Sequence, residues 1–413
     1  MSQQITQELR ARGTAQVIVE LKQPVSVDAP AAAAVADIDR HFTVSELSQD
    51  SALAFAAGRA EPPPVRYYPN LGLALGTVTR RGLAGLRADT ARVARVAGAP
   101  PLSLIRPTRI AAAPPQQETT WGIKALGVPQ LWRDGLTGEG VLVGHLDTGV
   151  DGRHPALEAA VASFAEFDLL GFEVQPTPEA HDTGEHGTHT AATIAGRPVN
   201  GRAVGVAPGA RVSSAAVIER GNAIARVLGG MNRFAGEVDT TRASILSMSL
   251  GFRGWWDDFL LITDALRARN ILPVFAVGNE GPGTSRSPGN YHQALSVGAM
   301  DRGLVVPYFS SAQRLARRLD PIVPDLIAPG VGIVSARPGG DWRAMDGSSM
   351  ATPHVAGLAA LLLQARPEAT VDQLEQAIFA SCQRPAGMRS ERGGRGLPNA
   401  PRALEELLRS AAA

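Results

Sequence analysis

Residues 345–357 read Met-Asp-Gly-Ser-Ser-Met-Ala-Thr-Pro-His-Val-Ala-Gly, a Gly-Ser turn that leads into a long apolar stretch. Because the apolar stretch continues, we expect a helix from Ser349 to Gln364. A hydroxyl at a helix start lies near the positive end of the helix dipole and near free backbone N–H groups. Ser349 is therefore a candidate nucleophile, although this segment taken alone favours a simple N-cap at Ser348 or Ser349.

Two other segments also place a reactive group beside a predicted strand or helix. Residues 141–149, Val-Leu-Val-Gly-His-Leu-Asp-Thr-Gly, form an apolar strand that ends at Asp147, and His186 opens a predicted helix. Open α/β sheets build their sites at such positions. His186 and His189 have the spacing of a metal-binding pair, but no third ligand stands at helical spacing beside them, so we reject that interpretation.

The rest of this region predicts an α/β fold. Short apolar runs alternate with helical stretches, which is typical of a doubly wound, mostly parallel sheet with helices on both faces. The expected strands are Val141–Leu146, Ala210–Ile218, Ile245–Met248, Ile271–Val277 and Ala294–Ala299. The expected helices are His186–Ala195, Trp256–Ala268 and Ser349–Gln364.

A smaller α+β unit precedes this region. The stretch Ala111–Thr119 is rich in small residues, proline and polar side chains, which favours an exposed linker. We therefore predict two domains, residues 1–115 and 116–413. Within the first we expect strands or β-rich stretches at Gln16–Lys22, Leu71–Val78 and Arg92–Ala97, and helices at Ala31–Phe42 and Gly82–Ala88.

Composition limits the partners and the compartment. The 413 residues carry 40 basic and 39 acidic side chains, so no strong charge points to nucleic acid or an anionic membrane as a partner. Cys382 is the only cysteine, which excludes an internal disulfide. The polar N-terminus lacks the apolar stretch of a conventional signal peptide, and no apolar run is long enough to span a bilayer. We expect a cytoplasmic protein or one exported without a conventional signal, and the sequence leaves both open.

Taken together, the three reactive segments resemble the subtilase family. Its signatures occur here as Leu146-Asp-Thr-Gly-Val150, His186-Gly-Thr-His189 and Gly347-Ser-Ser-Met-Ala-Thr-Pro353, in the chain order Asp, His, Ser. The resemblance extends from about Trp121 to Leu408. It implies a subtilisin-like serine endopeptidase that acts on proteins or peptides.

The resemblance assigns the catalytic roles residue by residue. Ser349 would attack the scissile carbonyl, His186 would take and return the proton, and Asp147 would orient His186. Asn279, with the Ser349 N–H, would hold the oxyanion.

Substrate binding is implied by two further segments. Ser249, Leu250 and Gly251 would pair with the substrate as an added strand. Arg286 stands two residues before Pro288-Gly289, where the family lines the pocket for the side chain that precedes the scissile bond. Its guanidinium predicts a preference for Glu or Asp there. The alternative, an arginine that extends into solvent and leaves an apolar pocket, stays open.

No cofactor is expected. The family's strong calcium site would need a carboxylate where this chain has Ala156 and an amide near Val199 or Asn200. We therefore predict that this site is empty, and leave open a weak second site near Asp325.

The N-terminal unit resembles a subtilase propeptide in position and size. Such a unit assists folding and inhibits the enzyme, and we expect self-processing between Arg106 and Thr120. A separate recognition module is the alternative for this unit. For the whole chain, the alternatives are a peptide ligase or macrocyclase with the same triad, and a non-catalytic binding scaffold.

Overall fold

A computed structural model describes residues 3–22, 38–43, 64–114, 118–218, 223–238, 241–316 and 320–410. Its centre is a seven-stranded sheet in which every neighbouring pair is parallel, in the order β18-β15-β13-β11-β8-β10-β9. These strands are β8 (Leu142–Asp147), β9 (Val161–Glu166), β10 (Arg211–Ala216), β11 (Ile245–Met248), β13 (Leu272–Ala276), β15 (Leu295–Met300) and β18 (Leu326–Pro329). This confirms the predicted α/β class.

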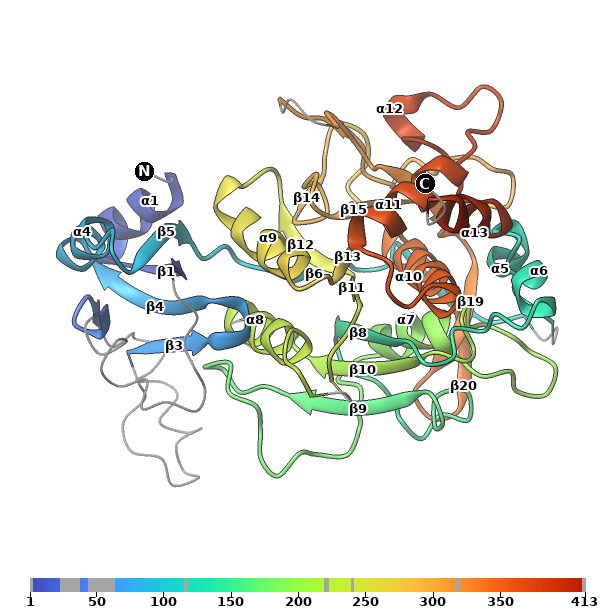
Figure 1. Cartoon of the computed structure of the whole chain (residues 1–413), viewed down its shortest axis with the longest axis horizontal. Coiled ribbons are helices and arrows are strands. Elements are labelled where there is room, and N and C mark those ends of the chain that lie inside the picture. Colours follow the sequence, from blue (N-terminus) through green and yellow to red (C-terminus); the bar gives the residue numbers. More distant parts are fainter. Residues whose placement is uncertain are drawn as a thin grey trace.

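Apolar side chains cover both faces of this sheet, because adjacent strand residues point to opposite sides. Ile245 belongs to one core cluster, whereas the next residue, Leu246, belongs to the other. The first cluster includes residues of α7 (His186–Ala195) and α10 (Ser348–Ala365), and the second includes residues of α8 (Ala223–Phe234) and α9 (Leu260–Ala268). The helices thus form a layer on each face (Figure 1).

The remaining elements of this part surround the sheet. The helical ones are α5 (Trp121–Ala125), α6 (Val128–Arg133), η4 (Asp257–Phe259), α11 (Val371–Ser381), α12 (Ser390–Gly393) and α13 (Ala400–Arg409). The short strands are β12 (Leu250–Arg253), β14 (Arg286–Ser287), β16 (Gln313–Arg314), β17 (Ile322–Val323), β19 (Ile333–Arg337) and β20 (Asp341–Asp346). Among the described residues, no helix is long and apolar enough to cross a membrane.

The N-terminal unit has its own five-stranded sheet and core. Its elements are α1 (Gln3–Arg12), β1 (Thr14–Leu21), β2 (Phe42–Thr43), β3 (Val65–Tyr68), η3 (Pro69–Leu71), β4 (Leu73–Thr79), α4 (Arg80–Ala88) and β5 (Val93–Gly98). Strand β1 alternates between two cores: Val17 and Val19 face the unit's own core, whereas Ile18 belongs to the cluster that contains α8 and α9. One face of the small sheet is therefore available for docking.

The N-terminal unit docks on helices α8 and α9, beside which Figure 1 shows it in blue. The buried Tyr68 donates its hydroxyl hydrogen to the Ala225 carbonyl of α8 at 3.0 Å. At the same helix, the Asn70 backbone N–H donates to Asn232 Oδ1 at 2.9 Å. Apolar burial and these hydrogen bonds together hold the unit in one orientation.

Between the two units, the chain forms β6 (Ser103–Leu104) and β7 (Arg109–Ala112). These strands pair with β12 and β20 respectively. The linker predicted at Ala111–Thr119 thus begins inside a strand, and its residues 115–117 lie outside the described part of the chain.

Most predicted elements lie within a few residues of the observed ones. The expected α7 and β11 match their observed bounds, and Trp256–Ala268 corresponds to η4 followed by α9. Strands β9 and β18, both at sheet edges, and helices α8, α11 and α13 were not predicted. Most of the helix expected at Ala31–Phe42 lies outside the described residues.

Candidate active site

Asp147 and His186 meet at the carboxyl end of the central strand β8. Asp147 ends β8, and His186 is the first residue of α7. His186 Nδ1 lies 2.7 Å from Asp147 Oδ1, and both side chains are buried. Glycine is needed at position 187, because a Cβ there would lie 2.0 Å from the Gly149 carbonyl oxygen. The close approach of residue 187 to Gly149 brings the start of α7 against the end of β8, which places the His186 ring beside Asp147.

The environment of Asp147 favours its charged form. Burial alone would raise its pKa, but the hydrogen bond and charge of His186, with His145 and the Thr148 N–H, hold the pKa below its ordinary value. Asp147 therefore remains ionised and keeps His186 Nδ1 protonated. The other ring nitrogen, His186 Nε2, is buried and has no hydrogen-bond partner among the described residues. It is free to accept a proton.

Ser349 and Asn279 lie close together at the start of α10. A Cβ placed on Gly347 would lie 2.8 Å from Ser349 Oγ and 3.0 Å from Asn279 Nδ2, so both polar groups border the same glycine. Asn279 Oδ1 accepts hydrogen bonds from the Ser348 N–H and hydroxyl, at 2.8 and 2.9 Å. These bonds orient the side-chain amide of Asn279, and its Nδ2 can therefore donate a hydrogen bond to another acceptor.

A second Asp–His–Ser group shares Asp147. His145 Nδ1 lies 2.9 Å from Ser214 Oγ, and His145 Nε2 lies 2.8 Å from Thr190 Oγ1 and 3.8 Å from Asp147 Oδ2. His145 and Ser214 are at most 1% exposed, and both ring nitrogens of His145 already have hydroxyl partners. Ser349 is equally buried, but His186 Nε2, unlike either ring nitrogen of His145, has no hydrogen-bond partner among the described residues and can take a proton. This group therefore supports Asp147 from inside the fold, and Ser349 is the better candidate nucleophile.

The chain between the two units lies across this site as an added strand. Strand β6 pairs antiparallel with β12, with Leu104 opposite Leu250 and Ser103 opposite Gly251. These β12 residues are among those predicted to bind substrate. The N-terminal segment thus takes the position expected for a substrate strand.

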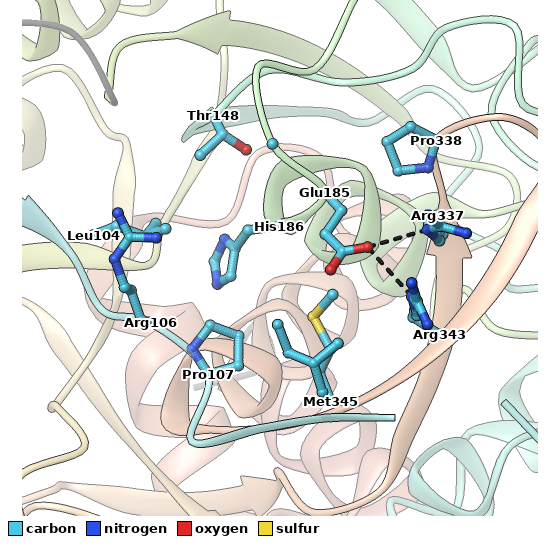
Figure 2. Close-up of a pocket in the computed structure, with 12 residues that line it drawn as sticks. Leu104, Arg106, Pro107, Thr148, Glu185, His186, Arg337, Pro338, Arg343 and Met345 are labelled. Carbon is cyan, nitrogen blue, oxygen red and sulfur yellow. Dashed lines mark hydrogen bonds and ion pairs between the residues drawn. The ribbon is translucent and has the colours of Figure 1, made fainter. Parts of the chain in front are cut away.

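The strand continues to the catalytic groups. The Ile105 N–H donates to the Ser249 carbonyl at 3.0 Å, and Asn279 Nδ2 donates to the Arg106 carbonyl at 2.9 Å. Figure 2 shows Arg106 and Pro107 beside His186. The Arg106 carbonyl therefore contacts the donor predicted to hold an oxyanion.

Beyond Pro107 the segment follows β20. The Thr108 N–H donates to the Asp346 carbonyl at 2.8 Å, and β7 then pairs antiparallel with β20. The segment 103–112, with its two short strands β6 and β7, thus covers both halves of the cleft.

Arg286 lies in the half of the cleft that precedes Arg106. It is 7% exposed, and its Nε donates to Glu280 Oε1 at 2.9 Å. Its Nη1 donates to the Gly251 carbonyl at 3.1 Å and to Ser103 Oγ at 2.9 Å. Burial alone would raise the pKa of Glu280, but Arg286 and the Asn279 N–H hold that pKa below its ordinary value. The guanidinium is therefore ion-paired, with one donor directed at the strand in the cleft.

The positions compared with the family calcium site carry few metal ligands. Ala156 is buried, and Val199 pairs with Arg202 across a tight turn. In the same loop, Arg197 donates three hydrogen bonds to backbone carbonyls, those of Ala195 and Ala210 at 2.9 and 2.8 Å and of Ala159 at 3.1 Å. Among the described residues, no cluster of three or more His, Cys, Asp or Glu side chains could hold a metal. The donor set does not suit a hard divalent cation.

Sequence reasoning did not identify His145, Glu280 or the pairing of residues 103–112 with the cleft. A signal existed for His145, since it stands two residues before Asp147 on a predicted strand and so shares its face. Glu280 follows Asn279 directly, and its partner Arg286 stands six residues later in β14, after a loop whose course no periodic pattern predicts. The strand pairings join segments more than a hundred residues apart, and such contacts leave no local pattern.

Comparison with known proteins finds relatives whose names describe them as subtilisins or other peptidases. Subtilisin-like protease PopC of Myxococcus xanthus is 33% identical over 301 residues, which cover 66% of this chain and 61% of PopC. Subtilisin Savinase of Lederbergia lenta is 34% identical over 253 residues, which cover 61% of this chain and 86% of that protein. Bacillopeptidase F of Bacillus subtilis is 30% identical over 295 residues, which cover 64% of this chain and 20% of that protein. The chain spans less than two thirds of the length of the first curated relatives that it matches.

A sequence model described as Subtilase family matches residues 138–397, well over half of the 413 residues. The matched region contains Asp147, His186, Asn279 and Ser349. The chain therefore belongs to the subtilase family, as its three signature segments predicted.

Proposed function

We propose that this protein is a serine endopeptidase that uses Ser349, His186 and Asp147 as a catalytic triad. The observation that carries the proposal is the Arg106 carbonyl, which accepts a hydrogen bond from Asn279 Nδ2 inside a strand that passes His186. A peptide carbonyl thus lies in contact with a predicted oxyanion donor. Family membership and relatives named as proteases support the same activity.

The proposed mechanism follows from the contacts of each group. Ser349 Oγ attacks the scissile carbonyl and passes its proton to His186 Nε2. The hydrogen bond from Nδ1 to Asp147 orients the ring and stabilises the imidazolium that forms. Asn279 and the backbone N–H of Ser349 stabilise the oxyanion, and His186 then gives its proton to the leaving amine. Water hydrolyses the acyl-enzyme by the same steps in reverse order.

The N-terminal unit acts, in this proposal, as an intramolecular inhibitor that is slowly processed. Its docking on α8 and α9 and the strand 103–112 in the cleft would exclude other substrates. The bond next to Asn279 is Arg106–Pro107. Because the proline ring replaces the N–H of an ordinary residue, it shields the leaving nitrogen from His186 and slows hydrolysis.

Arg286 is proposed to favour acidic side chains before the cut. The Nη1 donor that now binds Ser103 Oγ would pass to a substrate that replaces the N-terminal strand. Glu280 already neutralises the guanidinium, so the preference for Glu over Gln should be about 1 kcal/mol.

The calcium-site region is proposed to need no metal, because Arg197 supplies a permanent cation to this loop. Its guanidinium binds three backbone carbonyls that would otherwise lack these donors. Nearby, Arg202 Nη2 donates to the Pro114 carbonyl at 2.9 Å and ties the loop to the N-terminal segment.

The triad predicts the effect of three substitutions. Ser349→Ala and His186→Ala should each lower kcat/KM for a reporter peptide by roughly 10⁶-fold, and the double variant should be hardly worse, because the triad acts as a unit. Ser214→Ala, the matched control, should retain activity in the folded protein. Product masses distinguish hydrolysis from ligation. Additive losses, or loss of activity in folded Ser214→Ala, would contradict the assignment of Ser349.

The inhibitory strand predicts slow self-cleavage in the wild type, between Arg106 and Thr120. Pro107→Ala should speed cutting after Arg106 at least about tenfold, because the leaving nitrogen, no longer enclosed by the proline ring, can then accept a proton from His186. Mass spectrometry of the N-terminal fragment identifies the cut. The control is Pro107→Ala combined with Ser349→Ala, which should stay at full length. Equal cutting in that control would indicate an outside protease, and no faster cutting in Pro107→Ala would refute the shielding role of Pro107.

The specificity pocket predicts opposite effects of two substitutions. The Arg286 donor contacts Ser103, three residues before Arg106, so wild type should prefer Glu over Gln, Leu and Phe at that substrate position. The residue directly before the cut, where the sequence predicted this preference, is varied in a second peptide series. Glu280→Gln should strengthen this preference, because it leaves the guanidinium charge uncompensated, and Arg286→Gly should abolish it. The measurement is kcat/KM for matched peptides. A wild type that prefers Leu or Phe, or an unchanged ranking in Arg286→Gly, would show that Arg286 does not select the substrate.

Because Arg197 binds three carbonyls in this loop, we expect the folded protein to be stable without a bound metal. A chelator should leave Tm unchanged within about 1 °C, whereas Arg197→Met should lower the free energy of unfolding by about 1–3 kcal/mol, because three carbonyls lose their donor. Arg211→Met, at an exposed position on β10, is the control and should change stability by less than about 0.5 kcal/mol. Denaturant titration measures both. A chelator-induced fall of several degrees would overturn metal independence.

A further inference from the structure

Strand β20 offers a second, longer binding edge in the half of the cleft that follows Pro107. The small sheet has the order β19-β20-β7, so β20 would be an edge strand if β7 left. The register places Met345 opposite Ile110 and Arg343 opposite Ala112. An incoming strand can therefore form the same ladder of main-chain hydrogen bonds that β7 forms now.

The face of this sheet beside His186 is basic. Arg343 and Met345 lie on one face of β20 because they are two residues apart. Arg337 of β19 lines the same cavity, which has a volume of about 540 Å³ and is also lined by Glu185 and Arg106. Figure 2 shows Arg337 and Arg343 converging on the Glu185 carboxylate.

On this face, within the part of the chain that the structure describes, Arg343 has only a shared ion-pair partner. Glu185 Oε2 is shared by Arg337 Nε at 3.2 Å and Arg343 Nε at 3.3 Å. Arg337 also pairs with the exposed Asp341 at 3.2 Å. Arg343 has no other ion-pair partner among the described residues, and its side chain is 28% exposed. Arg337 thus has two carboxylate partners, whereas Arg343 has, in the same described region, only the Glu185 carboxylate, which it shares with Arg337.

The N-terminal strand supplies no carboxylate to Arg343. Its two side chains on the basic face belong to Ile110 and Ala112, both of which are exposed and neither of which carries a charge. A directly opposed pair in an antiparallel ladder has Cβ atoms about 5 Å apart, and a diagonal neighbour is within reach of a long side chain. A carboxylate at either position could therefore pair with Arg343.

We propose that β20 binds the leaving-group half of the substrate as an added strand, and that Arg343, assisted by Arg337, selects an acidic side chain there. The preferred substrate carries Glu or Asp at the fourth or sixth residue after the one whose carbonyl meets Asn279, which are the positions of Ile110 and Ala112. This inference rests on the proposed peptidase function and extends it to a substrate class. It also makes the N-terminal strand, which has no carboxylate at these positions, a weaker occupant than an acidic substrate.

The first test uses the intact chain and needs no catalysis. In the Ser349→Ala background, Ala112→Glu should slow amide hydrogen exchange in β7 about two- to fivefold relative to the isosteric Ala112→Gln, because the new carboxylate pairs with Arg343. Adding Arg343→Met should remove this difference. Equal exchange in the Glu and Gln variants, or a difference that persists in Arg343→Met, would refute the acidic preference.

The second test measures substrate selection. Wild-type protein should hydrolyse peptides with Glu at the fourth or sixth position after the cut with a kcat/KM about two- to fivefold higher than that for matched Gln peptides, and Arg343→Met should make them equal. If cleavage depends on Ser349 but does not distinguish Glu from Gln, the inference is wrong and the proposed function stands. If no peptide is cleaved, the proposed function fails, and the exchange experiment still decides the inference.

Discussion

The buried hydrogen bond between Asp147 and His186 is the interaction on which the site depends. It forms because β8 ends at the carboxyl edge of a parallel sheet, where α7 begins. Beneath it, His145 and Thr190 surround the second carboxylate oxygen of Asp147, so this charged side chain is supported without contact with water. The cost of burying the charge is thereby offset by hydrogen bonds and by the imidazole. Strand β8 of the central sheet thus positions Asp147, and the first turn of α7 positions His186.

The same geometry explains why the chain can cover its own cleft. A peptidase that binds substrates as added strands must expose the edges of β12 and β20, and any extended segment of the same molecule can pair with them. Here the N-terminal unit is anchored on α8 and α9, which places residues 103–112 along both edges. Docking and strand pairing reinforce each other, because each reduces the entropy cost of forming the other. Proline at the bond beside Asn279 fits a segment that resists being cut.

The local sequence predicted the elements that carry their own pattern. The strand before Asp147, the helix after His186 and the helix after Ser349 combine apolar periodicity with family signatures, and all three were placed correctly. Strands β9 and β18 were missed because they lie at sheet edges and have short or mixed patterns. The alanine-rich stretch near Ala112 was taken for a linker, since its strand character comes from β20, which lies more than two hundred residues away. The ion pair between Glu280 and Arg286 joins residues six apart in the chain, but it depends on the course of the loop between β13 and β14, which has no periodic pattern.

In the proposed mechanism Ser349, and not Ser214, is the nucleophile. A serine-directed fluorophosphonate, followed by mass spectrometry of the modified peptides, tests it most directly, because the reagent requires an activated and accessible hydroxyl. If Ser349 is the nucleophile, we expect one adduct on the full chain, located on Ser349. It should form slowly, because residues 103–112 cover the cleft. An adduct on Ser214, or labelling that persists in Ser349→Ala, would contradict it.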